Sequence, residues 1–151
     1  MLSTNRSTPR ILGLSLAFLL LFSVVSATVS VPNLFTDHMV LQRDLENPVW
    51  GKAAPGEAVT VAIAGQTHRT TANNQGEWRI TLDPLPAGGP HELVISGENT
   101  LTLSDVLIGE VWFCSGQSNM QWPLINTNNA EVEIASANFP KIRLLTVPTV
   151  G

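Results

Sequence analysis

Residues 109–124 read GEVWFCSGQSNMQWPL, an apolar run followed directly by polar side chains. Ser118 stands four residues past Cys114, and Gly116 removes side-chain bulk just before it. A serine at the end of a strand can expose its Oγ for nucleophilic attack, while nearby backbone N–H groups stabilise an oxyanion. Ser118 is therefore a candidate nucleophile, although Met120 replaces the last glycine of the usual G-x-S-x-G turn.

The residues around this serine allow both a functional and a packing interpretation. Four of them could shape an oxyanion site or contact a substrate, namely Gly116, Gln117, Asn119 and Gln121. Polar side chains in such a loop could equally bond backbone groups of the loop itself. Trp122 could stack on a sugar ring or cover the loop. Trp112 and Cys114 lie inside the apolar run and are predicted to be buried.

Three histidines are the candidates for a base or a metal ligand within these 151 residues: His38, His68 and His91. All three lie in a region of alternating apolar residues, nothing in the sequence places them against Ser118, and their spacing matches no metal site. We interpret them as surface or hydrogen-bonded histidines, and leave another role open for His38. The sequence thus predicts neither a metal nor an organic cofactor.

The first 27 residues have the pattern of a secretory signal peptide. Arg6 and Arg10 precede an uncharged apolar stretch at 11–25, and small residues follow up to Ala27. We expect cleavage after Ala27 and a secreted or periplasmic protein that has no membrane attachment. The alternative is an uncleaved membrane anchor, which needs about 20 apolar residues.

Removal of residues 1–27 would leave an acidic chain. The sequence has eight Lys or Arg and twelve Asp or Glu, and two of the basic residues lie in the signal peptide, so residues 28–151 carry a net charge of −6. An acidic surface without a basic cluster argues against nucleic acid and anionic lipid as partners. The single cysteine cannot form an internal disulfide.

Alternating apolar residues dominate residues 31–104 and predict a small all-β domain at 28–104. In EAVTVAIA and EWRITL every second side chain is apolar, and Gly-, Pro- and Asn-rich turns separate such runs. We expect strands near 39–43, 48–52, 57–64, 67–72, 76–82, 91–96 and 100–103. This pattern is typical of a β-sandwich of the jelly-roll or immunoglobulin-like kind.

The pattern changes after Asp105. VLIGEVWFCS is almost continuously apolar, as in a strand buried on both faces of a parallel sheet. Asn128 or Asn129 can cap a helix over AEVEIASA, Pro140 ends that helix, and residues 141–147 are predicted to form a second strand. Residues 105–151 would thus begin an α/β domain of a longer protein. Alternatively, this part packs on the β domain as an extra layer.

The block GEVWFCSGQSNMQWPL resembles the nucleophile block of the sialate O-acetylesterase family, which is a branch of the SGNH hydrolases. Four further stretches look like the amino-terminal region of that family: residues 34–44 (LFTDHMVLQRD), 48–61 (PVWGKAAPGEAVTV), 76–93 (GEWRITLDPLPAGGPHEL) and 139–147 (FPKIRLLTV). The resemblance covers nearly all of the mature chain. It implies a flavodoxin-like α/β esterase domain after the β-sandwich.

The resemblance also implies a reaction. Ser118 would attack the carbonyl of an O-acetylated sugar and form an acetyl-enzyme, which water then hydrolyses. In the family, the histidine and its acidic partner come from a late D-x-x-H block, which would lie beyond Gly151. Ser118 would supply its hydroxyl and its backbone N–H, and the fragment alone is expected to be inactive.

Two hypotheses of function follow from the sequence. The first is a serine esterase that removes O-acetyl groups from sialic acid or acetylated polysaccharide. The second is a non-catalytic β-sandwich module that binds carbohydrate or stabilises a partner domain.

Overall fold

A computed structural model describes residues 28–147 of the chain, so the predicted signal peptide lies outside the described residues. Seven strands lie in this part: β1 (Val40–Gln42), β2 (Asn47–Lys52), β3 (Ala58–Ile63), β4 (Gln66–Thr71), β5 (Glu77–Leu82), β6 (Gly88–Ser96) and β7 (Thr100–Gly109). One curled mixed sheet has the order β1-β7-β6-β3-β4, and β2 pairs with β5 in a second sheet. Only the β1–β7 pair is parallel among these pairings. The chain is mostly β, as predicted.

The two sheets share one apolar core. Every second residue of β3 and of β5 is buried, which confirms the predicted period of two. Val61, Leu93 and Ile95 come from the larger sheet, and Trp78 and Leu82 come from the smaller one. Fully burying one such aliphatic side chain contributes about 1.5–3 kcal/mol. This core defines what we call the β domain, residues 28–109.

Tight turns set the register of the strands. Ile63 pairs with Gln66, so Ala64 and Gly65 alone connect β3 to β4. Both have positive φ, of 48° and 84°, as a two-residue type I′ hairpin requires. Between β4 and β5, the Asn73 side chain accepts hydrogen bonds from the backbone N–H groups of Gln75 and Glu77, both at 2.9 Å. These turns account for strand positions that the sequence predicted to within a few residues.

The apolar run after Asp105 does not form the single strand that the sequence predicted. Val106 and Ile108 are buried in β7, which pairs with β6 and, in parallel, with β1. The strand ends at Gly109, and the following residues are exposed: Trp112 is 82% exposed, and Cys114 is exposed as well. The prediction that both are buried was therefore wrong. Among the described residues there is no further strand with which residues 111–115 could pair, and an unpaired strand is unstable in water.

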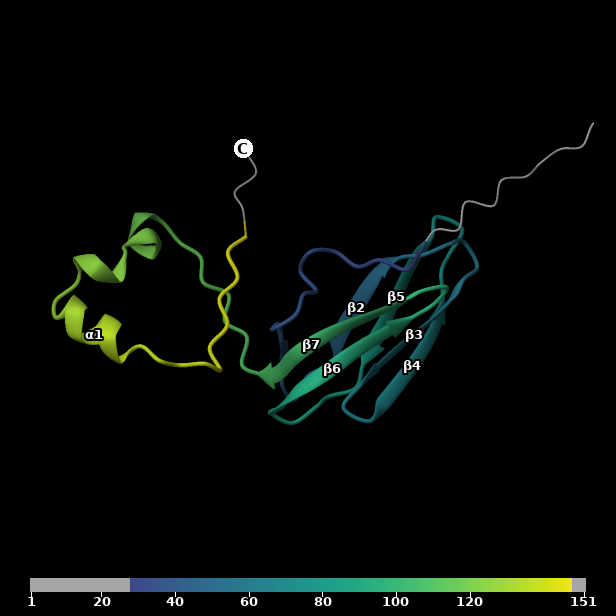
Figure 1. Cartoon of the computed structure of the whole chain (residues 1–151). Helices are drawn as coiled ribbons and strands as arrows, with labels where there is room; N and C mark the ends of the chain where they lie inside the picture. The colour runs from purple at the N-terminus through teal and green to yellow at the C-terminus, as the bar shows by residue number, and fades with distance from the viewer. Residues whose placement is uncertain (1–27, 148–151) are drawn as a thin grey trace, which may run out of the picture.

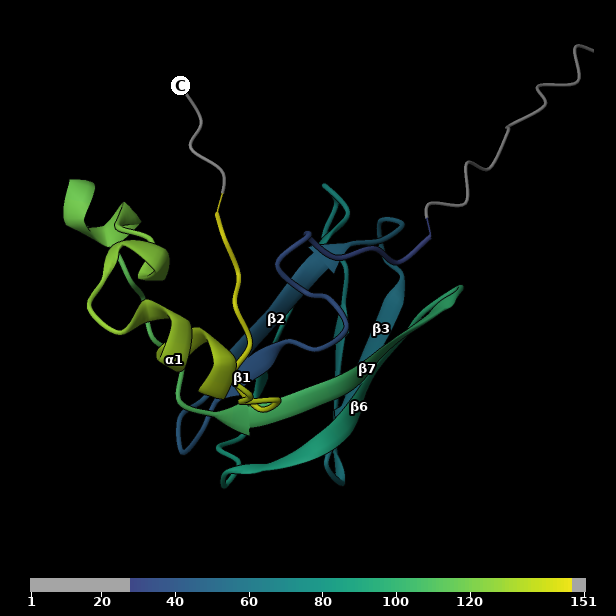
Figure 2. The ribbon, with the colours of Figure 1, turned by 60° about the vertical axis from the view of Figure 1, so that its left-hand side comes forward.

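Residues 110–147, called here the C-terminal segment, extend away from the sheets (Figures 1 and 2). They contain two short 3-10 turns, η1 (Ser118–Gln121) and η2 (Leu124–Asn126), and one helix, α1 (Ala130–Ser136). The helix confirms the prediction for AEVEIASA, with Asn129 before its first turn. It ends at Ser136, four residues before Pro140.

The second predicted strand, at 141–147, is absent from the described structure, where these residues have no regular secondary structure. The expected start of an α/β domain is therefore seen only in its helix. The physical reason is the same as for residues 111–115, because no neighbouring strand is available in the described part. Among the described residues, no helix has the length and apolar character needed to cross a membrane.

Candidate active site

Ser118 is the first residue of η1. Backbone hydrogen bonds close this turn, from the Met120 N–H to the Gln117 carbonyl at 2.9 Å and from the Trp122 N–H to the Asn119 carbonyl at 3.3 Å. A Cβ on Gly116 would lie 2.6 Å from Cγ of Met120, so the glycine lets the methionine pack on the backbone. Ser118 is exposed, and the structure of residues 28–147 gives its Oγ no hydrogen-bond partner. A hydroxyl presented in this way is open to solvent and to substrate.

The neighbours of Ser118 are also open to solvent. Gln117, Asn119 and Gln121 are exposed, and their side chains have no hydrogen-bond partners within residues 28–147. Trp122 differs, because its indole N–H donates to the Asn126 carbonyl at 3.3 Å and so connects η1 to η2. The ring is still 61% exposed. Trp122 therefore stabilises the loop while leaving much of its surface free for stacking.

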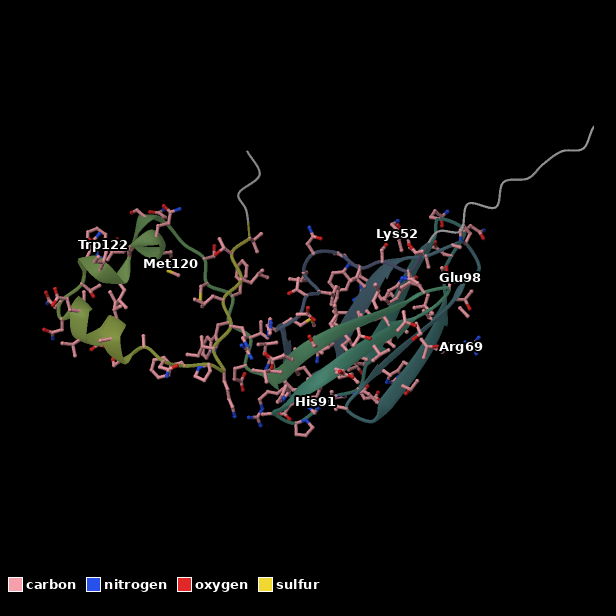
Figure 3. All side chains as sticks on the ribbon, viewed as in Figure 1. Lys52, Arg69, His91, Glu98, Met120 and Trp122 are labelled. Carbon is pink, nitrogen blue, oxygen red and sulfur yellow. The ribbon has the colours of Figure 1, made fainter. Side chains whose placement is uncertain are left out.

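The three histidines lie in the β domain, away from this turn. His38 Nδ1 is 2.6 Å from Asp105 Oδ2. His68 Nε2 is 2.8 Å from Gln66 Oε1 and 3.4 Å from a carboxylate oxygen of Asp83. Figure 3 shows His91 on the sheets, whereas Met120 and Trp122 lie on the C-terminal segment. Within residues 28–147, the nucleophile loop thus has no hydrogen-bonded histidine beside it.

Asp105 is the most connected carboxylate near the C-terminal segment. The hydrogen bond from His38 has the largest effect and lowers the pKa of Asp105; burial has the next largest effect and raises it, and the Arg143 charge lowers it again, so that the net shift is downward. Arg143 Nη2 donates to the same Oδ2 at 2.7 Å. This cluster leaves no local signal in the sequence, because Asp105 lies 38 or more residues from each of its partners and no spacing rule connects them.

Ser118 adjoins neither a group of metal-ligating side chains nor either of the two grooves found among residues 28–147. Among residues 28–147, no three His, Cys, Asp or Glu side chains gather closely enough to hold a metal ion. Two shallow grooves lie on the β domain. One, of about 370 Å³, is lined by residues of β2 and β5 including Trp50 and Arg79, and the other, of about 240 Å³, surrounds the β3–β4 turn. Ser118 lines neither groove.

Known proteins resemble this chain in sequence. The sialate O-acetylesterase of Homo sapiens is 36% identical over 125 residues, which is 74% of this chain and 24% of that protein. The sialate O-acetylesterase of Mus musculus is 35% identical over 127 residues, or 76% of this chain and 24% of the relative. The chain therefore spans about a quarter of the length of the curated relatives it matches. No family model matches it.

A solved structure resembles the chain in fold as well. A carbohydrate acetylesterase from Xanthomonas citri superposes with a TM-score of 0.72 at 38% sequence identity, over 75% of this chain and 26% of that one. These findings confirm the resemblance predicted from the nucleophile block. Over about three-quarters of its length, the chain is a homologue of sialate O-acetylesterases and of a bacterial carbohydrate acetylesterase.

Proposed function

We propose that the chain carries the nucleophile of an exported serine esterase that removes O-acetyl groups from sugars. The observation that carries the proposal is Ser118 in Gly116–Met120, an exposed hydroxyl at the first residue of a closed turn, in a chain homologous to carbohydrate acetylesterases. The proposed substrate is an O-acetylated sugar, either sialic acid or an acetylated polysaccharide, and the similarity to sialate O-acetylesterases and to a carbohydrate acetylesterase supports this class. No metal or organic cofactor takes part in the proposed reaction.

In the proposed reaction, Ser118 Oγ attacks the acetyl carbonyl, and a histidine accepts the hydroxyl proton. The same histidine protonates the departing sugar oxygen, which leaves an acetyl group on Ser118. Water then adds to the acetyl-enzyme and releases acetate. The backbone N–H of Ser118 and groups of the surrounding loop, with Gln117 and Asn119 nearest, stabilise the oxyanion.

The base in this proposal lies outside residues 28–147. His38 and His68 are already engaged with carboxylates of the β domain, which supports this assignment. The β domain, residues 28–109, then serves as an accessory domain, and the residues after Gly109 begin the esterase domain of SGNH type. The boundary expected between residues 104 and 105 falls inside β7, whose second half is buried in the core of the β domain. The signal peptide, cleaved after Ala27, exports the protein to the periplasm or the medium.

The test is acetate release from O-acetylated sialic acid and from acetylated xylan by the whole protein. We expect Ser118→Ala to lower kcat/KM by about 10⁴-fold or more, because the nucleophile and its base act as a unit. Ser115→Ala is the matched control, since Ser115 is an exposed serine of the same loop. Its kcat/KM should stay within about twofold of wild type, as is usual for an exposed residue outside the chemistry.

Three outcomes separate the hypotheses. Near-normal turnover by Ser118→Ala would refute the proposal. Residues 28–151 alone should release no acetate, because they lack the base, and measurable hydrolysis by this fragment would contradict the assignment of the base. Saturable binding of an acetylated sugar with no hydrolysis by the whole protein would instead favour the non-catalytic carbohydrate-binding module.

A further inference from the structure

The C-terminal segment begins with a firm attachment to β1. Gln42, the last residue of β1, accepts a hydrogen bond from the Val111 N–H at 2.8 Å and donates from its Nε2 to a carboxylate oxygen of Glu110 at 3.1 Å. The Arg43 N–H also donates to the Gly109 carbonyl at 2.9 Å. The first residues after β7 are therefore held beside the end of β1.

The segment returns to the same sheet through Arg143. Its Nη2 donates to Asp105 Oδ2 at 2.7 Å, and the same oxygen lies 2.6 Å from His38 Nδ1. Arg143 and Ala130 are the two half-buried residues of 110–147, and the others in that range are exposed. Figure 2 shows the yellow chain after α1 coming back to the end of β7 and β1. Residues 110–143 thus leave and rejoin the β domain at neighbouring points.

Contacts within the β domain, without Arg143, hold the backbone next to Asp105 in place. The side chain of Asp37 accepts hydrogen bonds from both the N–H and the Oγ of Ser104, at 2.6 and 2.9 Å. The His38 N–H donates to the Ser104 carbonyl at 3.0 Å. His38 and Asp105 both have positive φ, of 65° and 53°, a conformation that persists in non-glycine residues only where the surroundings impose it.

Between its two attachments, the segment forms hydrogen bonds only within itself. Within the described residues, every hydrogen bond made by residues 112–142 joins two residues of that range. The position of η1, and with it Ser118, therefore depends on the two ends. An esterase needs its nucleophile placed within about 0.5 Å of the productive geometry, so an attachment of this kind has a catalytic consequence.

We infer that Asp105 is a positioning residue. Its carboxylate accepts hydrogen bonds from His38 of the β domain and from Arg143 of the C-terminal segment, and so holds the nucleophile-bearing segment in place on the β domain. The role in catalysis rests on the proposed esterase function. The role in placing the segment does not, because it follows from the contacts of Gln42, Asp105 and Arg143 alone.

Cys114 allows a direct measurement of the placement. It is the single cysteine of the chain, it is exposed, and it lies in the segment. We would attach one nitroxide to Cys114 and another to Thr67→Cys on exposed β4, in residues 28–151, which keep the whole β core. Double electron–electron resonance then gives the distance distribution between the labels.

We expect a narrow distribution for the parent protein and, for Asp105→Asn and Arg143→Met, one at least about twofold broader, since loss of a paired charge releases a chain of low local stability. Asparagine tolerates positive φ, so Asp105→Asn preserves the backbone. The double variant should be no broader than either single one. Asp83→Asn is the matched control, because it removes another carboxylate beside a histidine, His68, and should leave the distribution unchanged. An unchanged width in Asp105→Asn would overturn the inference.

Turnover by the whole protein tests the catalytic consequence. Asp105→Asn should lower kcat roughly ten- to hundredfold with a smaller change in KM, because misplacement of the nucleophile affects the chemical step. Arg143→Lys keeps the positive charge and should lower kcat less than Arg143→Met does. If Ser118→Ala keeps its activity, the esterase proposal fails while the distance measurement still decides the attachment. If Ser118 is essential and Asp105→Asn has normal kcat, the positioning role is refuted.

Discussion

The β domain and the C-terminal segment are built from comparably apolar sequences and differ completely in burial. Residues 28–109 form a continuous core in which Val49, Leu82 and Ile95 are fully inaccessible to solvent. In residues 110–147 no side chain is buried, and Phe113 and Leu144 are 90% and 94% exposed. The two parts differ in burial because every strand of the β domain pairs with another strand of the same domain, whereas residues 110–147 contain no strand.

This contrast determines which measurement suits each part of the molecule. The free energy of unfolding reports on the β domain, whereas the position and mobility of the chain report on the C-terminal segment. The β domain is held by burial of apolar area, so it should respond to loss of volume. The C-terminal segment is held by a few polar attachments at its ends, from Gln42 and Asp105. The position of the segment should therefore change when these charges or hydrogen bonds are removed. The apolar side chains of the segment should contribute little to the free energy of unfolding.

The largest expected effect comes from matched leucine truncations. Leu82→Ala removes a fully buried side chain from β5 and should lower the free energy of unfolding by about 2–5 kcal/mol. Leu144→Ala removes a side chain that is 94% exposed and should change it by less than about 0.5 kcal/mol. Urea denaturation of residues 28–151, followed by tryptophan fluorescence, measures both. A cost for Leu144→Ala similar to that for Leu82→Ala would show that the segment has a core of its own.

Most of the β domain could be predicted from the sequence, because alternation of apolar residues reports burial on one face of a strand. The expected strands at 57–64 and 76–82 match β3 and β5 to within one residue. Two strands are longer than expected: β6 begins at Gly88 rather than at residue 91, and β7 continues to Gly109 rather than ending at residue 103. The second half of β7 pairs with β1 in parallel, and a pairing between strands so distant in sequence leaves no local signal.

The residues of the candidate site could be proposed from the sequence, where they stay a prediction, whereas their surroundings could not. Ser118 and its loop were found from a motif at a strand end, which is a local pattern. The burial of Trp112 was predicted wrongly, because an apolar residue reveals a preference for contact and not whether a partner is present. Asp105 was missed as a contact point because its backbone conformation and its partners arise only in the folded chain.

Glycine substitutions sharpen the same comparison with a smaller effect. A Cβ on Gly51 would clash with the Ser30 carbonyl oxygen and lie 2.9 Å from the Trp78 ring, so Gly51→Ala forces the backbone to move and should cost about 1–3 kcal/mol. A Cβ on Gly116 would meet only the flexible Met120 side chain. Gly116→Ala should therefore leave the thermal midpoint within about 2 °C of the parent. Equal midpoints for the two variants, measured by circular dichroism, would contradict the assignment of Gly51 to the packed region.

Acidification should release the C-terminal segment at a pH set by Asp105. Hydrogen bonding from His38, together with the Arg143 charge, holds the pKa of Asp105 below its ordinary value of 3.8. A carboxylate with a lowered pKa in the folded state contributes its full stabilisation above the ordinary value and loses it as the pH falls through the lowered one. His38 and Arg143 face this carboxylate directly, and Asp37 lies beside His38.

The mobility of a nitroxide on Cys114 should therefore stay constant from neutral pH down to the ordinary carboxyl value of 3.8 and rise only below it. Electron paramagnetic resonance spectra recorded across this range measure the change, and circular dichroism at each pH checks that the β domain is still folded. In Asp105→Asn the label should be mobile at every pH, because the charged partner of Arg143 is absent. A mobility change centred at about pH 6.5 in the parent protein would mean that a histidine, rather than the Asp105 carboxylate, controls the attachment.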